Sequence, residues 1–257
     1  MFAAEIKFTK GASEGESFTD VVYTLLGCWE KNGQIADTPW TVADAEDALR
    51  AYVMVPSRDS LDERFANKYV REYLAKYLKI TSSVPQITIL GPDPDSAPAC
   101  GCENPVDYIL FTNFMTVESP IRCAECFHPV PLYLLPFTDD EEHLDALSWV
   151  SDYKACDTLQ MHCTVGERFG EQQMLRHDSA LSKSGRELCR KLEAKIQGKV
   201  YYFLHKYRGR SVAAERKRLC PECDRSWILA DQWHGLFDFR CEHCRLLSNI
   251  ASSLKQW

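Results

Sequence analysis

Residues 219–249 read LCPECDRSWILADQWHGLFDFRCEHCRLLSN, and two Cys-x-x-Cys pairs lie within this stretch. The first pair is Cys220 and Cys223, the second is Cys241 and Cys244, and 17 residues separate the pairs. A two-residue gap lets both thiolates of one turn face the same metal ion, and the long spacer accommodates the strands that bring two such turns together. The stretch therefore predicts a zinc ribbon over residues 211–257.

Four cysteine thiolates complete the tetrahedral coordination of Zn²⁺, so no position is left for a reacting water molecule. We therefore expect this ion to be structural. His234 and His243 are also potential zinc ligands, but beside a complete set of cysteines they are expected at the surface or as hydrogen-bond supports for a ligand. The alternative is that the four thiols hold no metal.

A second set of cysteines lies in the middle of the chain. Cys100 and Cys102 have a one-residue gap, Cys123 and Cys126 have a two-residue gap, and 20 residues lie between the pairs. A closed site accounts for all four, so we expect a second Zn²⁺ in a β insertion over residues 93–138. A vestigial or redox-active arrangement is the alternative. The other cysteines lack close partners and are expected as small buried hydrophobic residues, namely Cys28, Cys156, Cys163 and Cys189.

The N-terminal region, residues 1–92, alternates between strand-like and helix-like patterns. Strands are expected at residues 2–8, 49–55 and 84–90, and an amphipathic helix at residues 18–31. Large side chains then recur every four residues, which predicts one helical stripe packed on a core rather than an aromatic stacking platform; the stripe comprises Leu61, Phe65, Tyr69, Tyr73 and Tyr77. This region therefore indicates a mixed α/β body.

Residues 91–100, GPDPDSAPAC, contain three prolines and predict a loop that marks a boundary. Strands are expected at residues 108–117 and 130–135. Residues 139–210 are expected to pack on the body, with a helix beginning in the acidic run 139–142, a second helix over residues 179–197 and a strand over 200–205. The expected fold class is α+β, with the two cysteine modules added to it.

Composition is that of a folded protein: 257 residues, 45% hydrophobic, with a net charge of −7. No segment approaches the roughly 20 apolar residues of a membrane helix, and the N-terminus lacks a long apolar signal core, so we expect a cytoplasmic protein without a membrane partner. Residues 1–182 carry 14 Lys and Arg against 29 Asp and Glu, whereas residues 183–257 carry 16 against 8. The basic end suits a nucleic-acid contact and the acidic body suits a basic protein partner.

One segment concentrates reactive side chains. Residues 149–167 include Asp152, Cys156, Asp157, His162, Cys163 and Glu167, which are residue types used in acid–base and nucleophilic catalysis. Neighbours in sequence such as His162 and Cys163 point in different directions, and no phosphate loop, dinucleotide turn, zinc-protease helix or hydrolase elbow occurs in the chain. We therefore expect a protein that is not an enzyme. An enzyme centred on residues 152–167 is the alternative.

Several blocks resemble a family of bacterial proteins described as containing a zinc ribbon and suggested to bind nucleic acid. The blocks are ESPIRCAECFHPVPLYLLP (118–136), SDYKACDTLQMHC (151–163), GER (166–168) and FDFRCEHCRLLSN (237–249). The resemblance implies zinc at the C-terminal ribbon and a role for the SDYKACD block, for which it gives no reaction.

The sequence therefore favours recognition over catalysis, with nucleic acid as the first interpretation. Phosphates would be neutralised by the cations around the ribbon, which are Arg210, Arg216, Lys217, Arg218, Arg225, Arg240 and Arg245. Trp227, Trp233 and Phe237 either stack on unpaired bases or cover the small ribbon core. The alternative is a protein-binding adaptor or immunity-type inhibitor, with the acidic residues 139–142 as an early contact for a basic partner.

Overall fold

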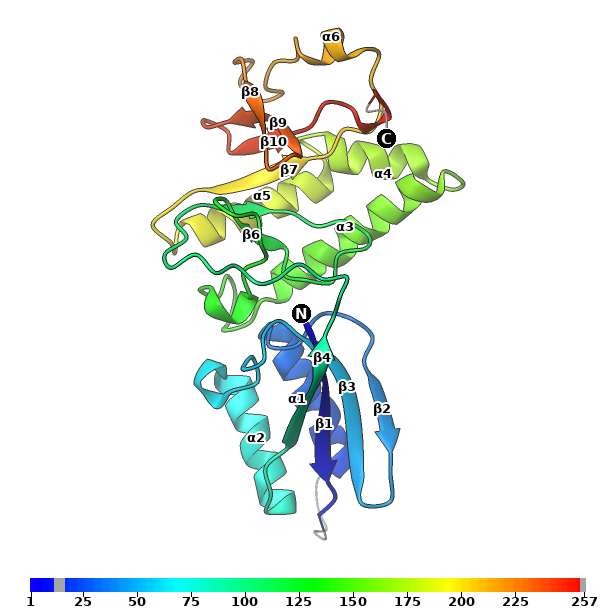
Figure 1. Ribbon diagram of the computed structural model, residues 1–257, viewed down its shortest axis with the longest axis vertical. Helices are drawn as coiled ribbons and strands as arrows, with labels where there is room; N and C mark the ends of the chain where they lie inside the picture. The colour runs from blue at the N-terminus through cyan, green and yellow to red at the C-terminus, as the bar shows by residue number, and fades with distance from the viewer. Residues whose placement is uncertain (12–16, 255–257) are drawn as a thin grey trace. The chain divides into compact units, whose positions relative to one another are not determined.

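A computed structural model describes residues 1–11 and 17–254 (Figure 1) and confirms the mixed α+β fold class. The chain forms two compact units. The N-terminal unit comprises Met1–Ala99, Val117–Ser119 and His128–Leu147, and the C-terminal unit comprises Cys100–Thr116, Pro120–Phe127 and Ser148–Trp257. Within the described residues, no helix has the length and apolar character needed to cross a membrane.

The N-terminal unit has the element order βαββαβ of a split βαβ arrangement. Its elements are β1 (Phe2–Thr9), α1 (Phe18–Lys31), β2 (Thr41–Asp44), β3 (Ala48–Val55), α2 (Lys68–Thr81) and β4 (Gln86–Pro92). The sheet order is β2-β3-β1-β4, and every neighbouring pair is antiparallel. The strands expected at residues 2–8 and 49–55 and the helix at 18–31 are confirmed.

The core of this unit follows from the periodicity of its first two elements. Alternate residues of β1, Ala4, Ile6 and Phe8, are buried. Ser17 caps α1 by accepting a hydrogen bond from the backbone N–H of Asp20, and the helix buries one apolar face that includes Leu25. Large side chains packed on a sheet in this way each stabilise the fold by about 1.5–3 kcal/mol.

The prediction of one continuous helical stripe from Leu61 to Tyr77 was wrong. A 3₁₀ turn, η1 (Glu63–Phe65), precedes α2, and Asn67 starts the helix by accepting a hydrogen bond from the N–H of Val70. An N-cap has an extended backbone, so the stripe is broken at that point. Tyr77 is fully buried in the core, which agrees with packing rather than stacking.

The C-terminal unit has one six-stranded sheet with helices beside it. Its strands are β5 (Tyr108–Leu110), β6 (Ile121–Cys123), β7 (Val200–Leu204), β8 (Ile228–Trp233), β9 (Phe237–Cys241) and β10 (Leu246–Ser248), in the order β6-β5-β7-β10-β9-β8. The helices are α3 (Leu144–His162), which begins in the N-terminal unit, α4 (Glu167–Leu175), α5 (Ala180–Glu193) and the short α6 (Val212–Glu215). The strand predicted at residues 200–205 is confirmed.

Strand β7 lies in the middle of this sheet. It pairs in parallel with β5 on one side and with β10 on the other. All five of its residues, VYYFL, are buried, as expected for a strand that is covered on both faces. One cover is α5, whose N-cap is Ser179 and which packs on β7. The helix ends at Glu193, earlier than the predicted residue 197.

Two predicted strands differ from the structure. The strand expected at 108–117 ends at Leu110, because the side chain of Asn113 accepts hydrogen bonds from the N–H groups of Met115 and Thr116 and turns the chain. Residues 130–135 contain a 3₁₀ turn, η2 (Leu132–Leu134), and not a strand. Proline lacks the N–H that a sheet requires, and Pro131 and Pro136 flank this turn.

The acidic run 139–142 does not begin a helix. Asp139 and Glu142 form an isolated bridge, and α3 starts at Leu144. Asp140 instead contacts α2, where its carboxylate lies 2.8 Å from Lys68 Nζ and accepts a 2.8 Å hydrogen bond from the hydroxyl of Tyr69. These acidic residues therefore already have partners inside the N-terminal unit.

Candidate metal centres

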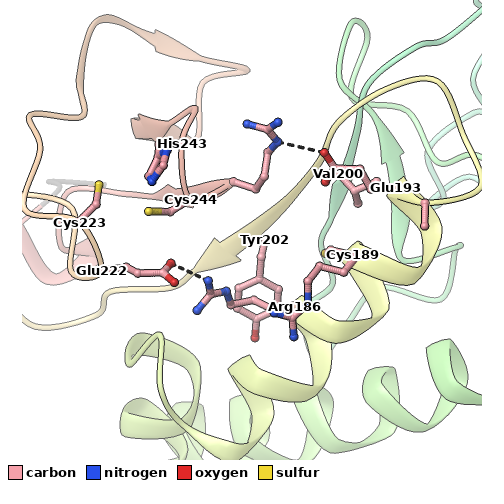
Figure 2. Close-up of a pocket in the computed structure, with 12 residues that line it drawn as sticks. Arg186, Cys189, Glu193, Val200, Tyr202, Glu222, Cys223, His243 and Cys244 are labelled. Atoms are coloured by element: carbon pink, nitrogen blue, oxygen red, sulfur yellow. Dashed lines mark hydrogen bonds and ion pairs between the residues drawn. The ribbon is translucent and has the colours of Figure 1, made fainter.

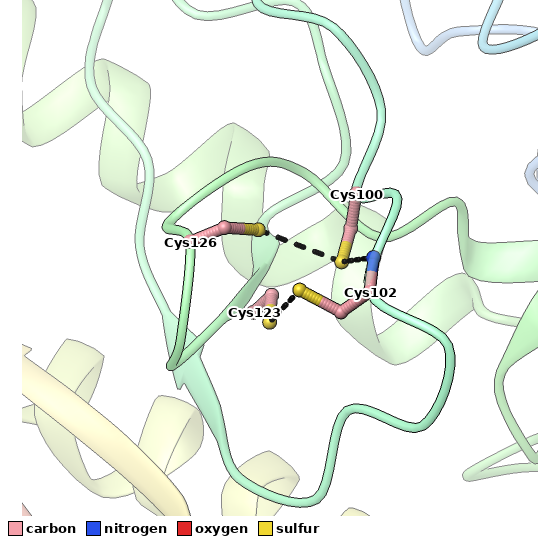
Figure 3. A group of neighbouring side chains, drawn as sticks. All are labelled: Cys100, Cys102, Cys123 and Cys126. Atoms are coloured by element: carbon pink, nitrogen blue, oxygen red, sulfur yellow. Dashed lines mark hydrogen bonds between the residues drawn. The ribbon is translucent and has the colours of Figure 1, made fainter.

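Cys100, Cys102, Cys123 and Cys126 form the mid-chain tetrad (Figure 3). The Sγ atoms of Cys102 and Cys123 are 3.9 Å apart, those of Cys100 and Cys126 are 3.6 Å apart, and all four lie within 4.8 Å of one another. Tetrahedral Zn²⁺ with bonds of about 2.3 Å places its sulfur ligands about 3.8 Å apart. A disulfide would require about 2.05 Å. The spacing therefore fits four ligands of one metal ion.

Cys220, Cys223, Cys241 and Cys244 form the C-terminal tetrad. Their Sγ atoms also lie within 4.8 Å of one another, with 3.6 Å between Cys223 and Cys241. Cys220 and Cys241 are buried, whereas Cys223 and Cys244 are half-buried. The pairing of turns predicted from the sequence therefore gives two closed four-cysteine groups with a geometry suited to metal binding.

All three Cys-x-x-Cys turns have the same backbone reversal. The residue after the second cysteine has a left-handed conformation in each: Phe127 at φ 62°, Asp224 at φ 54° and Arg245 at φ 56°. The N–H of Phe127 donates to the carbonyl of Cys123, and the N–H of Asp224 donates to the carbonyl of Cys220, both at 2.9 Å. Residues other than glycine rarely adopt this conformation, so its recurrence indicates a common turn built around the two thiolates.

Backbone N–H groups also point at the sulfur atoms. Cys100 Sγ accepts from the N–H of Cys102, Cys123 Sγ from that of Glu125, and Cys241 Sγ from that of Cys244, each at 3.4 Å. Such donors favour a thiolate over a thiol. Burial has the opposite effect, since desolvation raises the pKa of Cys100 and of Cys220 to about 11. A bound cation is what would offset this desolvation and keep the ligands ionised.

The two tetrads are connected within the C-terminal unit through His234, in the turn between β8 and β9. Its Nε2 lies 2.8 Å from the carbonyl oxygen of Ala124, which belongs to the turn between Cys123 and Cys126. A carbonyl only accepts hydrogen bonds, so Nε2 carries the proton in this contact. The imidazole also stacks on Phe127, with ring centroids 5.1 Å apart and an interplanar angle of 16°. His234 therefore contacts the backbone of the mid-chain tetrad.

The seven cations predicted to contact nucleic acid fall into two groups. Arg210, Arg216, Lys217 and Arg225 are exposed. The other three are half-buried and have partners inside the protein. Arg218 Nε is 3.0 Å from a Glu215 oxygen and its guanidinium lies 4.3 Å from the Phe239 ring centre. Arg240 pairs with Glu242 at 2.7 Å, and Arg245 pairs with Glu193 at 3.2 Å.

The ribbon aromatics mostly form its core. Trp227 is 3% exposed and Phe237 is fully buried, so neither has a free face for a base. The stacking interpretation is therefore wrong for these two, because the small module uses them to cover its interior. Trp233 is partly exposed. Its ring stacks on His234, and the guanidinium of Arg240 lies 4.9 Å from its ring centre.

The reactive residues of the segment 149–167 lie in different environments. Cys156 and Asp157 are buried in α3, whereas His162 and Cys163 are exposed where that helix ends. The Oδ2 of Asp157 accepts a 2.8 Å hydrogen bond from the N–H of Phe114, and burial raises the pKa of this carboxyl group. This hydrogen bond gives Asp157, one residue of the SDYKACD block, a structural role. The sequence did not indicate it, because Phe114 is 43 positions away.

Fold and sites together define a two-unit α+β protein with two four-cysteine groups. Three family models match successive parts of the chain, each a domain of unknown function: DUF8589 over residues 1–91, DUF2310 over 102–205 and DUF8594 over 209–254. An uncharacterized Haemophilus influenzae protein is 32% identical over 260 residues, covering 98% of both chains, and the chain belongs to one family with it. A second uncharacterized protein of that organism is 34% identical over 163 residues, which is 63% of this chain and 80% of that protein. No solved structure matches significantly.

Proposed function

We propose that each tetrad holds one Zn²⁺ ion in a structural role. Thiolate ligands and tetrahedral geometry are the combination that Zn²⁺ prefers, and the sulfur separations of 3.6–3.9 Å support this ion. With four cysteines per site, neither ion has an open position for catalysis. The ions would instead hold together the short turns and strands of each module, which are small for a stable fold of their own.

We further propose that the protein binds nucleic acid without catalysing a reaction, through the C-terminal ribbon. The supporting observation is the set of four exposed cations around this module, Arg210, Arg216, Lys217 and Arg225. Phosphate neutralisation by such residues supplies affinity that does not depend on sequence. Arg218, Arg240 and Arg245 each pair with a carboxylate of the protein, so they are not counted among the phosphate-neutralising cations.

The test is binding of the zinc-loaded protein to mixed-sequence RNA and DNA at two salt concentrations. We expect affinity to fall steeply with salt, and the double variant Arg216→Gln/Lys217→Gln to reduce the logarithmic salt slope by about 1.5. The matched control is Arg71→Gln/Lys79→Gln, which removes two exposed cations from α2 in the N-terminal unit. Cys220→Ser disrupts the ribbon and should abolish binding. Absence of binding at low salt would refute the proposal.

A further inference from the structure

A groove of about 570 Å³ lies between α5 and the two cysteine turns of the C-terminal tetrad (Figure 2). Val200 and Tyr202 of β7 contribute its apolar lining, and Ala194, at the end of α5, lines it as an exposed residue. The sulfur-bearing residues Cys223 and Cys244 line another part. The volume is within the range of about 300–1,000 Å³ that is usual for small-molecule sites.

Two ion pairs between α5 and the ribbon line the groove. An Nη of Arg186 lies 2.5 Å from Glu222, and Nε of Arg245 lies 3.2 Å from Glu193. A dashed line joins Arg186 and Glu222 in Figure 2. All four side chains keep between 20% and 36% of their surface exposed. A guanidinium has five N–H donors and a carboxylate has about four acceptor positions, so each pair retains unused donors and acceptors.

The charge of the tetrad restricts what can enter. Four thiolates around one divalent cation would carry a net negative charge, and Cys223 and Cys244 are among the residues that line the groove. An anionic group would be repelled on this side, whereas a neutral planar group would not. The ligand part that fits is therefore flat and uncharged, with hydrogen-bond donors and acceptors on its edge. Nucleobases have these properties, and unpaired bases are commonly bound by arginine planes and edge hydrogen bonds.

Among the bases, guanine can form the largest number of charge-assisted hydrogen bonds with an Arg–Glu pair. Its O6 and N7 accept from one guanidinium, and its N1–H and N2–H groups donate to one carboxylate. We infer that this groove binds a guanine base, supplied by a single-stranded nucleic acid or by a free nucleotide. Arg190, on α5, is an exposed cationic lining residue at which the attached phosphate can lie away from the thiolates.

This inference rests on the proposed nucleic-acid function, so its test uses two RNAs. One is a fluorescein-labelled oligouridylate, and the other has the same length with one central guanine. The variant Ala194→Trp fills the groove from an exposed position, and its control is Ala180→Trp, at the opposite end of α5. Anisotropy is measured with the full-length zinc-loaded protein.

We expect the central guanine to increase affinity about tenfold in the wild type and in Ala180→Trp. Ala194→Trp should remove this gain while still binding oligouridylate. If guanine brings no gain, or if the gain survives Ala194→Trp, the groove assignment is wrong, although binding of oligouridylate would leave the proposed function intact. If neither RNA binds, both fail.

Competition by free nucleotides distinguishes the two sources of the base. Displacement of the guanine-containing RNA by GMP, and not by AMP at the same concentration, would show that a free nucleotide suffices. If the tenfold gain in affinity is retained but GMP does not compete, the groove binds guanine only as part of an RNA strand. Equal displacement by AMP and GMP would overturn the choice of guanine.

Discussion

Nε2 of His234 donates a hydrogen bond to the carbonyl oxygen of Ala124 at 2.8 Å, across 110 positions of sequence. One partner lies in the hairpin of the C-terminal ribbon and the other lies between two cysteines of the mid-chain tetrad. The ring of Phe127 stacks on the same imidazole. One hydrogen bond and one ring contact therefore connect the two four-cysteine groups.

We expect His234→Ala to weaken metal binding at the mid-chain tetrad about tenfold, as is common when a hydrogen-bond support behind a metal site is removed. Zinc transfer to a chromophoric chelator measures this, with Cys123→Ser and Cys241→Ser each used to identify one site. The control is His162→Ala, an exposed histidine at the end of α3. Unchanged transfer from the mid-chain site would show that the contact carries no coupling.

Two neighbouring cations should behave differently when neutralised. Arg218→Gln leaves Glu215, which is 6% exposed, without its closest cation, and removes a hydrogen bond of 2.7 Å to the Asn249 carbonyl. We expect a loss of about 2 kcal/mol in the free energy of unfolding. Arg216→Gln changes an exposed side chain and should leave stability unaltered. Urea denaturation compares them, and similar losses would contradict the division into structural and available cations.

Asp157 should give a pH-dependent stability difference. Asp157→Ala leaves the N–H of Phe114 without its acceptor, so we expect a loss of about 1–3 kcal/mol, or several degrees in Tm. Asp157→Asn keeps an acceptor oxygen and removes the buried charge, and it should be more stable than the wild type at pH 7.

The sign of the pH effect follows from the raised pKa of Asp157 in the folded state. The folded protein binds this proton more tightly than the unfolded chain, so the wild type gains stability as pH falls from 7 through the folded pKa. The gain is complete below the unfolded pKa. The advantage of Asp157→Asn should therefore shrink on acidification, and an advantage that grows would contradict the assignment.

Gly185 marks a close approach of α5 to its neighbours. A Cβ atom there would lie 2.3 Å from the ring of Tyr202 and 2.4 Å from the indole nitrogen of Trp149. Gly185→Ala should therefore destabilise the C-terminal unit by about 1–3 kcal/mol through overpacking, although alanine is the better helix former. Ser184→Ala, at the exposed neighbouring position, is the control. Chemical denaturation that found Gly185→Ala at least as stable as wild type would refute this packing.

Local sequence patterns predicted both tetrads and the elements with strong periodicity. The cysteine gaps limit how far apart the sulfur atoms of one turn can lie, and the alternation at residues 2–8 determines which face of β1 is buried. Breaks caused by single polar side chains were missed, because Asn67 and Asn113 act through hydrogen bonds that depend on backbone geometry.

Contacts between residues that are far apart in the sequence could also not be predicted from local sequence patterns. Nothing in the sequence distinguishes Arg216 from Arg218, although only the second lies against Phe239 and Glu215. The groove beside the C-terminal tetrad combines α5, β7 and two cysteine turns, which are separate in the chain. The same holds for His234: the sequence suggested a surface residue or a hydrogen-bond support, but it did not indicate Ala124 as its partner.

The position of His234 in the chain also determines when, during synthesis, the contact between the two tetrads can form. During synthesis, all four cysteines of the mid-chain tetrad leave the ribosome before β7, the central strand, has been made. A metal ion can therefore organise residues 100–126 before strand β7, their neighbour in the sheet, has been made. His234 emerges about a hundred residues later, so its contact with Ala124 can form only after every cysteine of the mid-chain tetrad has been made.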